Sequence, residues 1–153
     1  MERRRLISTA AIGGVAAGAV AAALPRPAIA QSMPEIKWRM PSSFPKSLDT
    51  LWGGAELVAK LVADMTDNKF QIRPFAAGEI VPALAVLDAV QAGTVEMGQS
   101  ASYYYVGKDP TFAFGSTVPF GFNTRQQQAW MLQGGALDLM NAFLKDYNVT
   151  SII

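Results

Sequence analysis

Neutral polar and aromatic side chains cluster at places where runs of apolar residues give way to loops. They are Ser42, Ser43, Gln99, Ser100, Tyr103 and Tyr104. Hydroxyl and amide groups both donate and accept hydrogen bonds, and tyrosine adds an apolar ring. Small-molecule pockets are lined mainly by apolar and aromatic groups with a few placed polar ones. These residue types therefore favour recognition of a small molecule over catalysis, although each one alone is also an ordinary turn or core residue.

Catalytic chemistry has little support in the composition. The 153 residues include no cysteine and no histidine, which removes thiol nucleophiles, the commonest general base and the usual zinc ligands. There is also no phosphate-binding G-x-x-x-x-G-K-[ST] motif and no G-x-G-x-x-G motif. We therefore expect no enzyme activity and no cofactor, and a hydrolase is the most distant alternative.

The carboxylates are expected to be mostly surface groups. Four of them fall on predicted polar helix faces: Asp49, Glu56, Asp64 and Asp138. Glu79 is the exception, because it lies in a loop between a predicted strand and a predicted helix. It could face a binding crevice, or it could serve the start of the helix.

The first 30 residues have the pattern of an export signal. Arg3 and Arg4 precede an uncharged run from Leu6 to Leu24, and Ala28 and Ala30 form a small-x-small cleavage site. An arginine pair before an apolar run is typical of twin-arginine export. We expect cleavage after Ala30 and a periplasmic protein; the alternative is an uncleaved membrane anchor.

Removing this leader changes the charge of the chain. The leader carries four basic residues and one acid: Arg3, Arg4, Arg5, Arg26 and Glu2. Of 13 basic and 12 acidic residues, nine and eleven remain, so the net charge falls from +1 to about −2. No basic patch is left to predict nucleic-acid binding.

Hydrophobic periodicity predicts alternating strands and helices. We expect strands over residues 36–40 and 69–75 with a helix over residues 49–65 between them, because apolar residues recur there at three- and four-residue steps. That apolar set is Leu51, Ala55, Val58, Val62 and Met65. A helix from Pro82 through Val90 should end at Gly93.

Three further elements are predicted in the second half of the chain. Residues 94–99 are expected to form a short buried strand, and residues 124–146 a helix opened by a capping box of Thr124 and Gln127. Residues 147–153 begin another strand. A strand without a partner at this point indicates an unfinished domain.

This order of elements predicts an α/β fold with a parallel or mixed sheet flanked by helices. Ligands of such sheets bind beyond the carboxyl ends of the strands. Three loops qualify, at residues 42–45, at residues 76–79 and from residue 100 onward, and we expect them to converge. Residues 31–35 are predicted to be a tether.

The three consecutive tyrosines cannot all point into one core, because neighbouring side chains diverge on a strand and on a helix. We expect Tyr105 to pack inward with Val106, and Tyr103 or Tyr104 to face the crevice.

The stretch "PFAAGEIVPALAVLDAVQAGTVEMGQSASYYYVGKDPTFAFGSTVPFGF" resembles the periplasmic substrate-binding subunit of tripartite ATP-independent periplasmic (TRAP) transporters, the dicarboxylate-binding-protein-like family. The likeness covers residues 36–150 and points to the branch associated with 2-oxo acids, mannitol and chloroaromatic compounds. It implies a periplasmic-binding-protein-like fold of two domains that closes around a carboxylate and delivers it to permease subunits driven by an ion gradient.

The resemblance also implies which parts are present. Residues 36–153 correspond to the first domain, incomplete at its C-terminus, with the second domain missing or truncated. The family's ligand-clamping arginine, and the groups that can hold a cation beside the ligand, lie beyond residue 153. The positions on the first-domain side of the cleft are Ser42, Ser43, Gln99, Ser100, Tyr103 or Tyr104, and Phe120. The alternative is a truncated remnant or an exported protein-interaction module.

Overall fold

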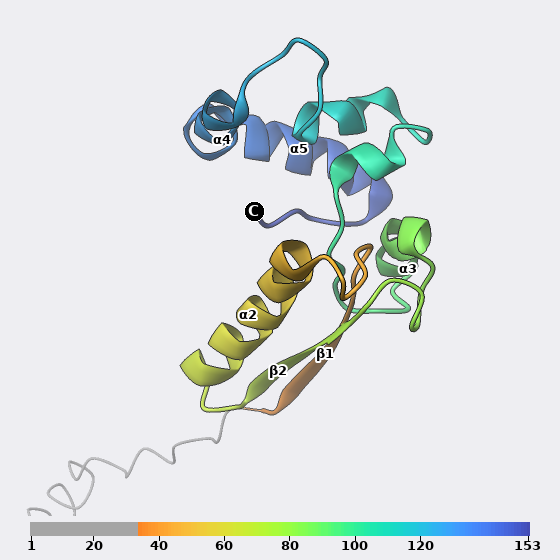
Figure 1. Cartoon of the computed structure of the whole chain (residues 1–153), viewed down its shortest axis with the longest axis vertical. Helices are drawn as coiled ribbons and strands as arrows, with labels where there is room; N and C mark the ends of the chain where they lie inside the picture. Colours follow the sequence, from red (N-terminus) through yellow and green to blue (C-terminus); the bar gives the residue numbers. More distant parts are fainter. Residues whose placement is uncertain (1–33) are drawn as a thin grey trace, which may run out of the picture. The chain divides into compact units, whose positions relative to one another are not determined.

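The computed structural model of the chain describes residues 34–153 (Figure 1). The leader predicted over residues 1–30, with its arginine pair and its cleavage site after Ala30, lies outside the described residues. None of the helices in residues 34–153 is long and apolar enough to cross a membrane.

A strand, a helix and a second strand form the first part of the described fold. Strand β1 (Ile36–Pro41) and strand β2 (Phe70–Phe75) pair in parallel, joined by helix α2 (Asp49–Met65), as the periodicity predicted. The register places Ile36 beside Phe70 and Trp38 beside Ile72, so the apolar side chains share one face. Helix α2 packs mainly against β2 (Figure 1).

The face of α2 that packs inward differs from the predicted one. Trp52 and Ala55 are its buried residues, whereas Leu51, Val58 and Met65 of the predicted apolar set are exposed. The helical periodicity of residues 49–65 was therefore predicted correctly. However, α2 carries a second apolar face that the described residues leave uncovered.

The predicted strand over residues 94–99 is wrong. Only one parallel bridge forms there, between Ser42 and Gln99. The Glu96 carboxylate accepts the backbone N–H of Arg39 at 2.8 Å, which a neighbouring strand's carbonyl would otherwise accept. The Arg39 guanidinium also pairs with Glu96 at 2.8 Å and donates to the Thr94 carbonyl at 2.7 Å. The Glu96 side chain thus takes the place of the backbone hydrogen bonds that a third strand would form with β1.

This ion pair predicts a specific loss of stability in acid. The hydrogen bonds from Arg39 lower the pKa of Glu96 from 4.5 to about 2. A carboxylate with a lowered folded-state pKa stabilises the fold fully above pH 4.5 and loses that contribution as the pH falls toward 2. We expect the unfolding temperature of Glu96→Gln to vary less than that of wild type across this window.

Thermal unfolding between pH 7 and pH 2 measures this difference, and Glu56→Gln on α2 is the matched control. An equally steep acid dependence in Glu96→Gln and in wild type would contradict the assignment. The pair is solvent-exposed, so the difference is modest and shrinks in high salt.

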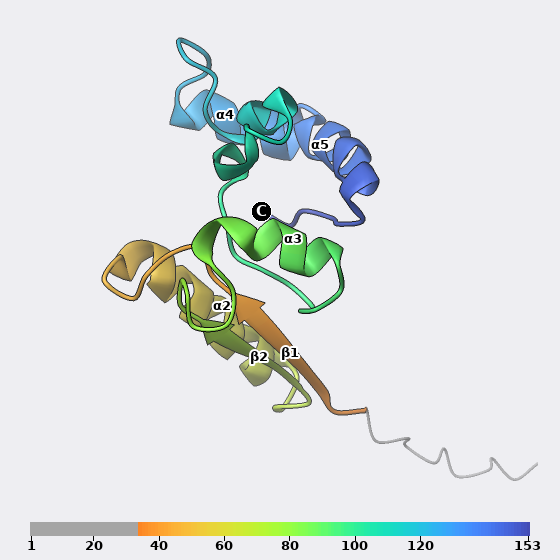
Figure 2. The same cartoon turned by 90° about the vertical axis from the view of Figure 1, so that its right-hand side faces the viewer.

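A short helical segment lies next to the carboxyl ends of the strands. The predicted helix forms as a 3-10 turn (Ala83–Ala85) followed by α3 (Val86–Gln91), and Gly93 ends it at a φ of +68°. Gly98 permits α3 to approach, because a Cβ there would lie 2.5 Å from Val86 Cγ1 and 3.6 Å from the Pro41 carbonyl oxygen. Figure 2 shows α3 beside the ends of the strands.

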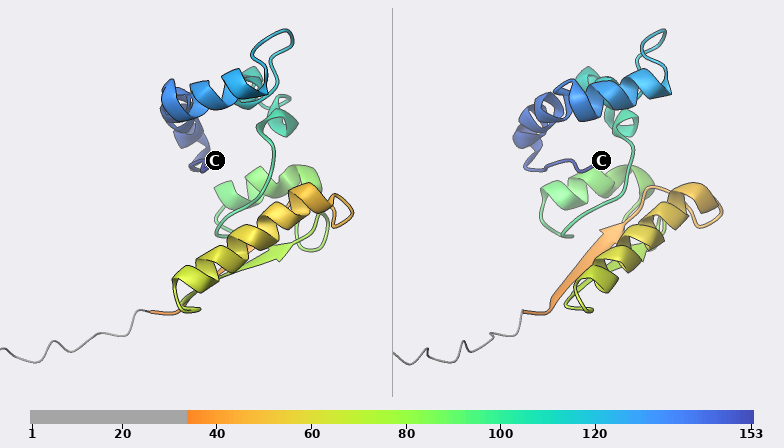
Figure 3. Two further views of the ribbon diagram at one scale, coloured as in Figure 1. Left: turned by 60° about the vertical axis from the view of Figure 1, so that its left-hand side comes forward. Right: turned by 90° about the vertical axis from the view of Figure 1, so that its left-hand side faces the viewer.

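The second half of the described chain is helical. Two 3-10 helices (Ser102–Tyr105 and Pro110–Gly115) precede α4 (Thr124–Gln133) and α5 (Ala136–Leu144), and a last 3-10 turn (Lys145–Tyr147) follows. Figure 3 shows the change of direction between α4 and α5.

Two predictions for this half are corrected. The single helix over residues 124–146 breaks at Gly134 and Gly135, the latter at a φ of +79°, and its capping box is formed by Asn123 and Gln126 instead of Thr124 and Gln127. The final predicted strand does not form. Instead, the Asn141 side chain holds the segment after α5, accepting from Ser151 N at 2.6 Å.

An aromatic core joins α3 to the helical half. Leu87, Tyr105, Phe112 and Leu144 are buried together, and the Phe112 ring lies 5.6 Å from the ring of Tyr105. The inward orientation of Tyr105 is confirmed. That of Val106 is wrong, because its side chain is 44% exposed.

Candidate functional site

Three loops meet at the carboxyl ends of the strands, as the sequence predicted. Ser42 N donates to the Phe75 carbonyl at 2.8 Å, and Ser43 N donates to the Gln99 carbonyl at 2.8 Å. Ala77 N donates to the Phe44 carbonyl at 3.1 Å. The backbone after β1 is therefore fastened both to the loop after β2 and to the segment that ends at Gln99.

Ser42 and Gln99 form the first side-chain link of this site. The Ser42 hydroxyl is fully buried, accepts from Phe44 N at 3.0 Å and lies 2.7 Å from Gln99 Oε1, to which it donates. The other end of the amide, Gln99 Nε2, donates to the Leu51 carbonyl at 2.8 Å. Gln99 thus connects the end of β1 with the first turn of α2.

A chain of hydroxyl groups forms the second link. Ser43 Oγ lies 2.6 Å from the Ala83 carbonyl and 2.7 Å from Ser100 Oγ. A carbonyl only accepts, so Ser43 donates its single proton there and accepts the Ser100 proton. Ser100 in turn accepts from the Tyr105 hydroxyl at 2.8 Å, and that oxygen accepts Leu87 N–H at 3.2 Å.

Every hydroxyl proton in this series of hydrogen bonds has an acceptor. In the part of the chain that the structure describes, no buried side-chain nitrogen or oxygen lacks a hydrogen-bond partner. The buried serines therefore hold the loops in register, and their spare hydrogen-bonding capacity is the lone pairs. Tyr105 belongs to the site as well, which sequence reasoning missed because an inward tyrosine looks like a core residue.

Glu79 stabilises the loop after β2. Its carboxylate pairs with Lys46 Nζ at 2.7 Å and accepts from Ala76 N at 3.0 Å. The hydrogen bond from Lys46 lowers the pKa of Glu79, with the Ala76 N–H adding to it. Of the two roles considered from the sequence, service of the helix start is not seen, since the partners are loop residues 76 and 46.

The predicted aromatic residues differ in their surroundings. Tyr104 is half-buried, with its ring 6.0 Å from Phe44 and 4.7 Å from Tyr103, whereas Tyr103 is 38% exposed. Phe120 is fully exposed at a φ of +58°, an unusual backbone conformation for a bulky residue. The structure thus brings Tyr104 to Phe44, places Tyr103 against Tyr104, and leaves the Phe120 ring in solvent.

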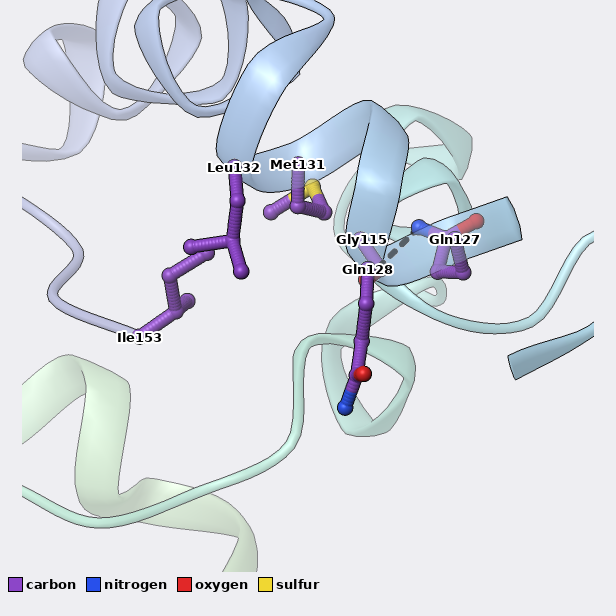
Figure 4. A pocket seen from close by; sticks show the side chains of 6 residues that line it. All are labelled: Gly115, Gln127, Gln128, Met131, Leu132 and Ile153. Atoms are coloured by element: carbon purple, nitrogen blue, oxygen red, sulfur yellow. Dashed lines mark hydrogen bonds between the residues drawn. The ribbon is translucent and has the colours of Figure 1, made fainter. Parts of the chain in front are cut away.

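A surface hollow in the helical half is lined by none of these residues. It has a volume of about 380 Å³ and is lined by Gly115, Gln127, Gln128, Met131, Leu132 and Ile153. Figure 4 shows Leu132 and Ile153 pointing toward one another, and the Gln127 amide donating to the Gly115 carbonyl at 3.1 Å. No charged side chain lines this hollow, so it offers no opposite charge to a carboxylate.

Metal-binding groups do not gather in the described part of the chain. Residues 34–153 contain no cluster of three or more aspartate or glutamate side chains placed to share an ion.

Comparison with known proteins identifies the family. The family model of bacterial extracellular solute-binding proteins, family 7 (DctP), matches residues 42–152. A monocarboxylate 2-oxoacid-binding periplasmic protein of Nostoc is 51% identical over 150 residues, which are 97% of this chain and 41% of that protein.

Two solved structures have the same fold. A TRAP transporter solute-binding protein of Bordetella bronchiseptica, with calcium and picolinate, is 44% identical with a TM-score of 0.74, over 76% of this chain and 35% of that one. A TRAP periplasmic solute-binding protein of Pseudoalteromonas atlantica, with sodium and pyruvate, is 36% identical with a TM-score of 0.68, over 74% and 34%.

The chain thus spans about two fifths of the curated relative and about a third of each solved structure. The solved structures share the α/β fold of this chain, and the family model matches it over residues 42–152. This chain belongs to the bacterial extracellular solute-binding proteins of family 7.

Proposed function

We propose that the chain contributes the first-domain side of a periplasmic receptor for a small carboxylate, such as a 2-oxo acid, that delivers its ligand to a TRAP permease. The observation that carries the proposal is the meeting of Ser42, Ser43, Gln99 and Ser100 at the carboxyl ends of the strands, where open α/β sheets bind ligands. The ligand class rests on the Nostoc relative and on the pyruvate-bound structure.

In this proposal residues 1–30 are the export leader, residues 31–35 a tether and residues 36–153 the first domain. Tyr103 and Tyr104 offer rings to the ligand, and Phe120 covers it once the rest of the receptor is in place. Ser42, Ser43, Gln99 and Ser100 fix the shape of the loops that face the ligand, and Glu79 holds the neighbouring loop.

The ligand's negative charge needs a partner from elsewhere. Lys46 pairs with Glu79 at 2.7 Å, and Lys108 pairs with Asp88 at 2.7 Å, so both lysines of these loops are engaged. A bidentate arginine is the group that best matches a carboxylate. We infer that this arginine comes from the part of the receptor that this chain does not match. Any groups that hold a cation beside the ligand come from the same part.

Ligand binding should raise the unfolding temperature without any turnover of the ligand, because a ligand that binds only the folded state stabilises it by mass action. At a concentration 100-fold above Kd the gain is about 2.7 kcal/mol. The measurement is a thermal-shift titration of the complete receptor with pyruvate and longer 2-oxo acids.

Tyr103→Ala should reduce the shift, whereas Phe114→Ala, which truncates an exposed ring outside the loop cluster, should not. Absence of a shift with every 2-oxo acid tested would count against the receptor and favour an exported protein-interaction module. A shift that survives Tyr103→Ala would keep the receptor but remove this tyrosine from its site.

A further inference from the structure

An ion pair lies at the border of the loop cluster. Lys46 follows Ser43 by three residues, and its Nζ is 2.7 Å from Glu79 Oε1. The same ammonium group lies 5.5 Å from the centre of the Trp52 ring, a distance at which a cation is attracted to the face of an aromatic ring. Lys46 is therefore held between a carboxylate and an indole ring beside the candidate site.

Glu79 is the fixed member of this pair. Its second carboxylate oxygen, Oε2, accepts from Ala76 N at 3.0 Å, and its own N–H donates to the Ala76 carbonyl at 3.0 Å. Gly78 turns the backbone between these two residues at a φ of +83°, which glycine adopts readily. The turn thus sets the position of the negative charge, and the flexible four-carbon stem of lysine adapts to it.

The pair borders the residues that are proposed to face the ligand. Ala77, in the same loop as Glu79, donates its N–H to the Phe44 carbonyl at 3.1 Å, and the Phe44 ring lies 6.0 Å from that of Tyr104. Charges act on one another over about 8 Å at physiological ionic strength, which is further than a hydrogen bond reaches. The charge state of this pair therefore contributes to the potential that a ligand beside these loops meets.

We propose that Glu79 is a specificity-determining residue, which makes the receptor prefer 2-oxo acids with one carboxylate over those with two. This inference rests on the proposed function. A second carboxylate, at the end of the ligand that lies beside these loops, meets the negative charge of Glu79 and a lysine that Glu79 already neutralises. Like charges brought together without a partner are unfavourable, and such repulsion is a common means of rejecting the wrong ligand. An uncharged chain end instead packs against aromatic rings such as that of Tyr104.

Calorimetric titration of the complete receptor with 2-oxopentanoate and with 2-oxoglutarate tests this role. The two acids share a five-carbon chain and differ only in whether the far end is a methyl group or a carboxylate. We expect wild type to bind 2-oxopentanoate more tightly. Glu79→Gln keeps an acceptor oxygen but removes the charge, so Lys46 becomes available to the second carboxylate. The ratio of 2-oxoglutarate to 2-oxopentanoate affinity should rise at least about tenfold at low salt, as expected for a gained hydrogen bond between charged groups.

Two further variants show whether the freed lysine causes the change. Glu79→Gln combined with Lys46→Gln should return the affinity ratio to about its wild-type value, because no ammonium group is left to pair with the second carboxylate. Asp64→Asn is the matched control. It also removes one negative charge and frees a lysine, Lys60, but both residues lie in the last turns of α2, whereas Trp52 lies in its first turn.

Circular dichroism checks that the variants fold, and Glu79→Ala provides a second way to free Lys46. The role of Glu79 is overturned if wild type binds the two acids equally, or if the affinity ratio is unchanged in the Glu79 variants. It is also overturned if the gain survives the loss of Lys46, or if Asp64→Asn gives an equal gain. All of these outcomes leave the receptor itself intact. Failure of the proposed function is distinct, because then neither acid binds to wild type, which overturns the receptor and this specificity together.

Discussion

Phe112→Ala is expected to destabilise the described fold by about 3–5 kcal/mol, the usual cost of truncating a buried aromatic ring. Phe112 is 2% exposed, and its ring lies 5.0 Å from that of Phe143 and 5.1 Å from that of Tyr147. These contacts join the 3-10 helix Pro110–Gly115 to α5 and the turn after it. Domains have only about 5–15 kcal/mol of total stability, so this loss leaves a large unfolded fraction.

Urea unfolding followed by circular dichroism measures the effect. Phe114→Ala is the control, since Phe114 sits two residues away in the same 3-10 helix and is 51% exposed. Substitutions at such exposed positions usually change stability by no more than about 0.5 kcal/mol. Equal losses from the two substitutions would show that the aromatic cluster is not the core of this region.

The sequence predicted elements where a local rule decides the structure. The β1–α2–β2 unit follows from alternation and from a 3.6-residue period, which are properties of short windows. The end of α3 at Gly93 follows from the preference of glycine for positive φ. Such rules locate an element but do not say which of two apolar faces becomes buried, which is why Leu51 and Val58 were assigned to the inward set.

Failures occurred where distant side chains replace backbone pairing. The segment after Gly93 has the composition of a strand, yet Glu96 takes the hydrogen bond that pairing with β1 would have used. The helix expected across residues 124–146 had its weak point marked by Gly134 and Gly135, but the competing local cap at Asn123 could be read only with the backbone in view. A tertiary contact overrides local preference in the first case, whereas local backbone conformation decides the second.

The sequence predicted the location of the candidate site better than the roles of its side chains. The rule that ligands bind beyond strand ends located the loops that meet at Ser42 and Gln99. It did not reveal that Ser43 and Ser100 share a hydrogen-bonded chain with Tyr105, because the pairing spans 57 residues between the two serines and the inward tyrosine has no separate signal in the sequence.

Tyr105→Phe should therefore cost more than the loss of one exposed hydroxyl. The Tyr105 oxygen accepts Leu87 N–H at 3.2 Å, and Leu87 lies in the first turn of α3, where backbone N–H groups have no partner within the helix. The same hydroxyl donates to Ser100 Oγ at 2.8 Å. Removing it leaves a buried donor without an acceptor, which costs about 1–3 kcal/mol.

Chemical unfolding gives this cost, and hydrogen exchange at the Leu87 amide should accelerate in the variant. Tyr103→Phe is the matched control, because that ring is partly exposed and should tolerate the change. Ser100→Ala combined with Tyr105→Phe should cost less than the sum of the single substitutions, since both break the same chain of hydroxyls. Strict additivity, or an equal loss in Tyr103→Phe, would separate Tyr105 from the serines and leave it a core residue only.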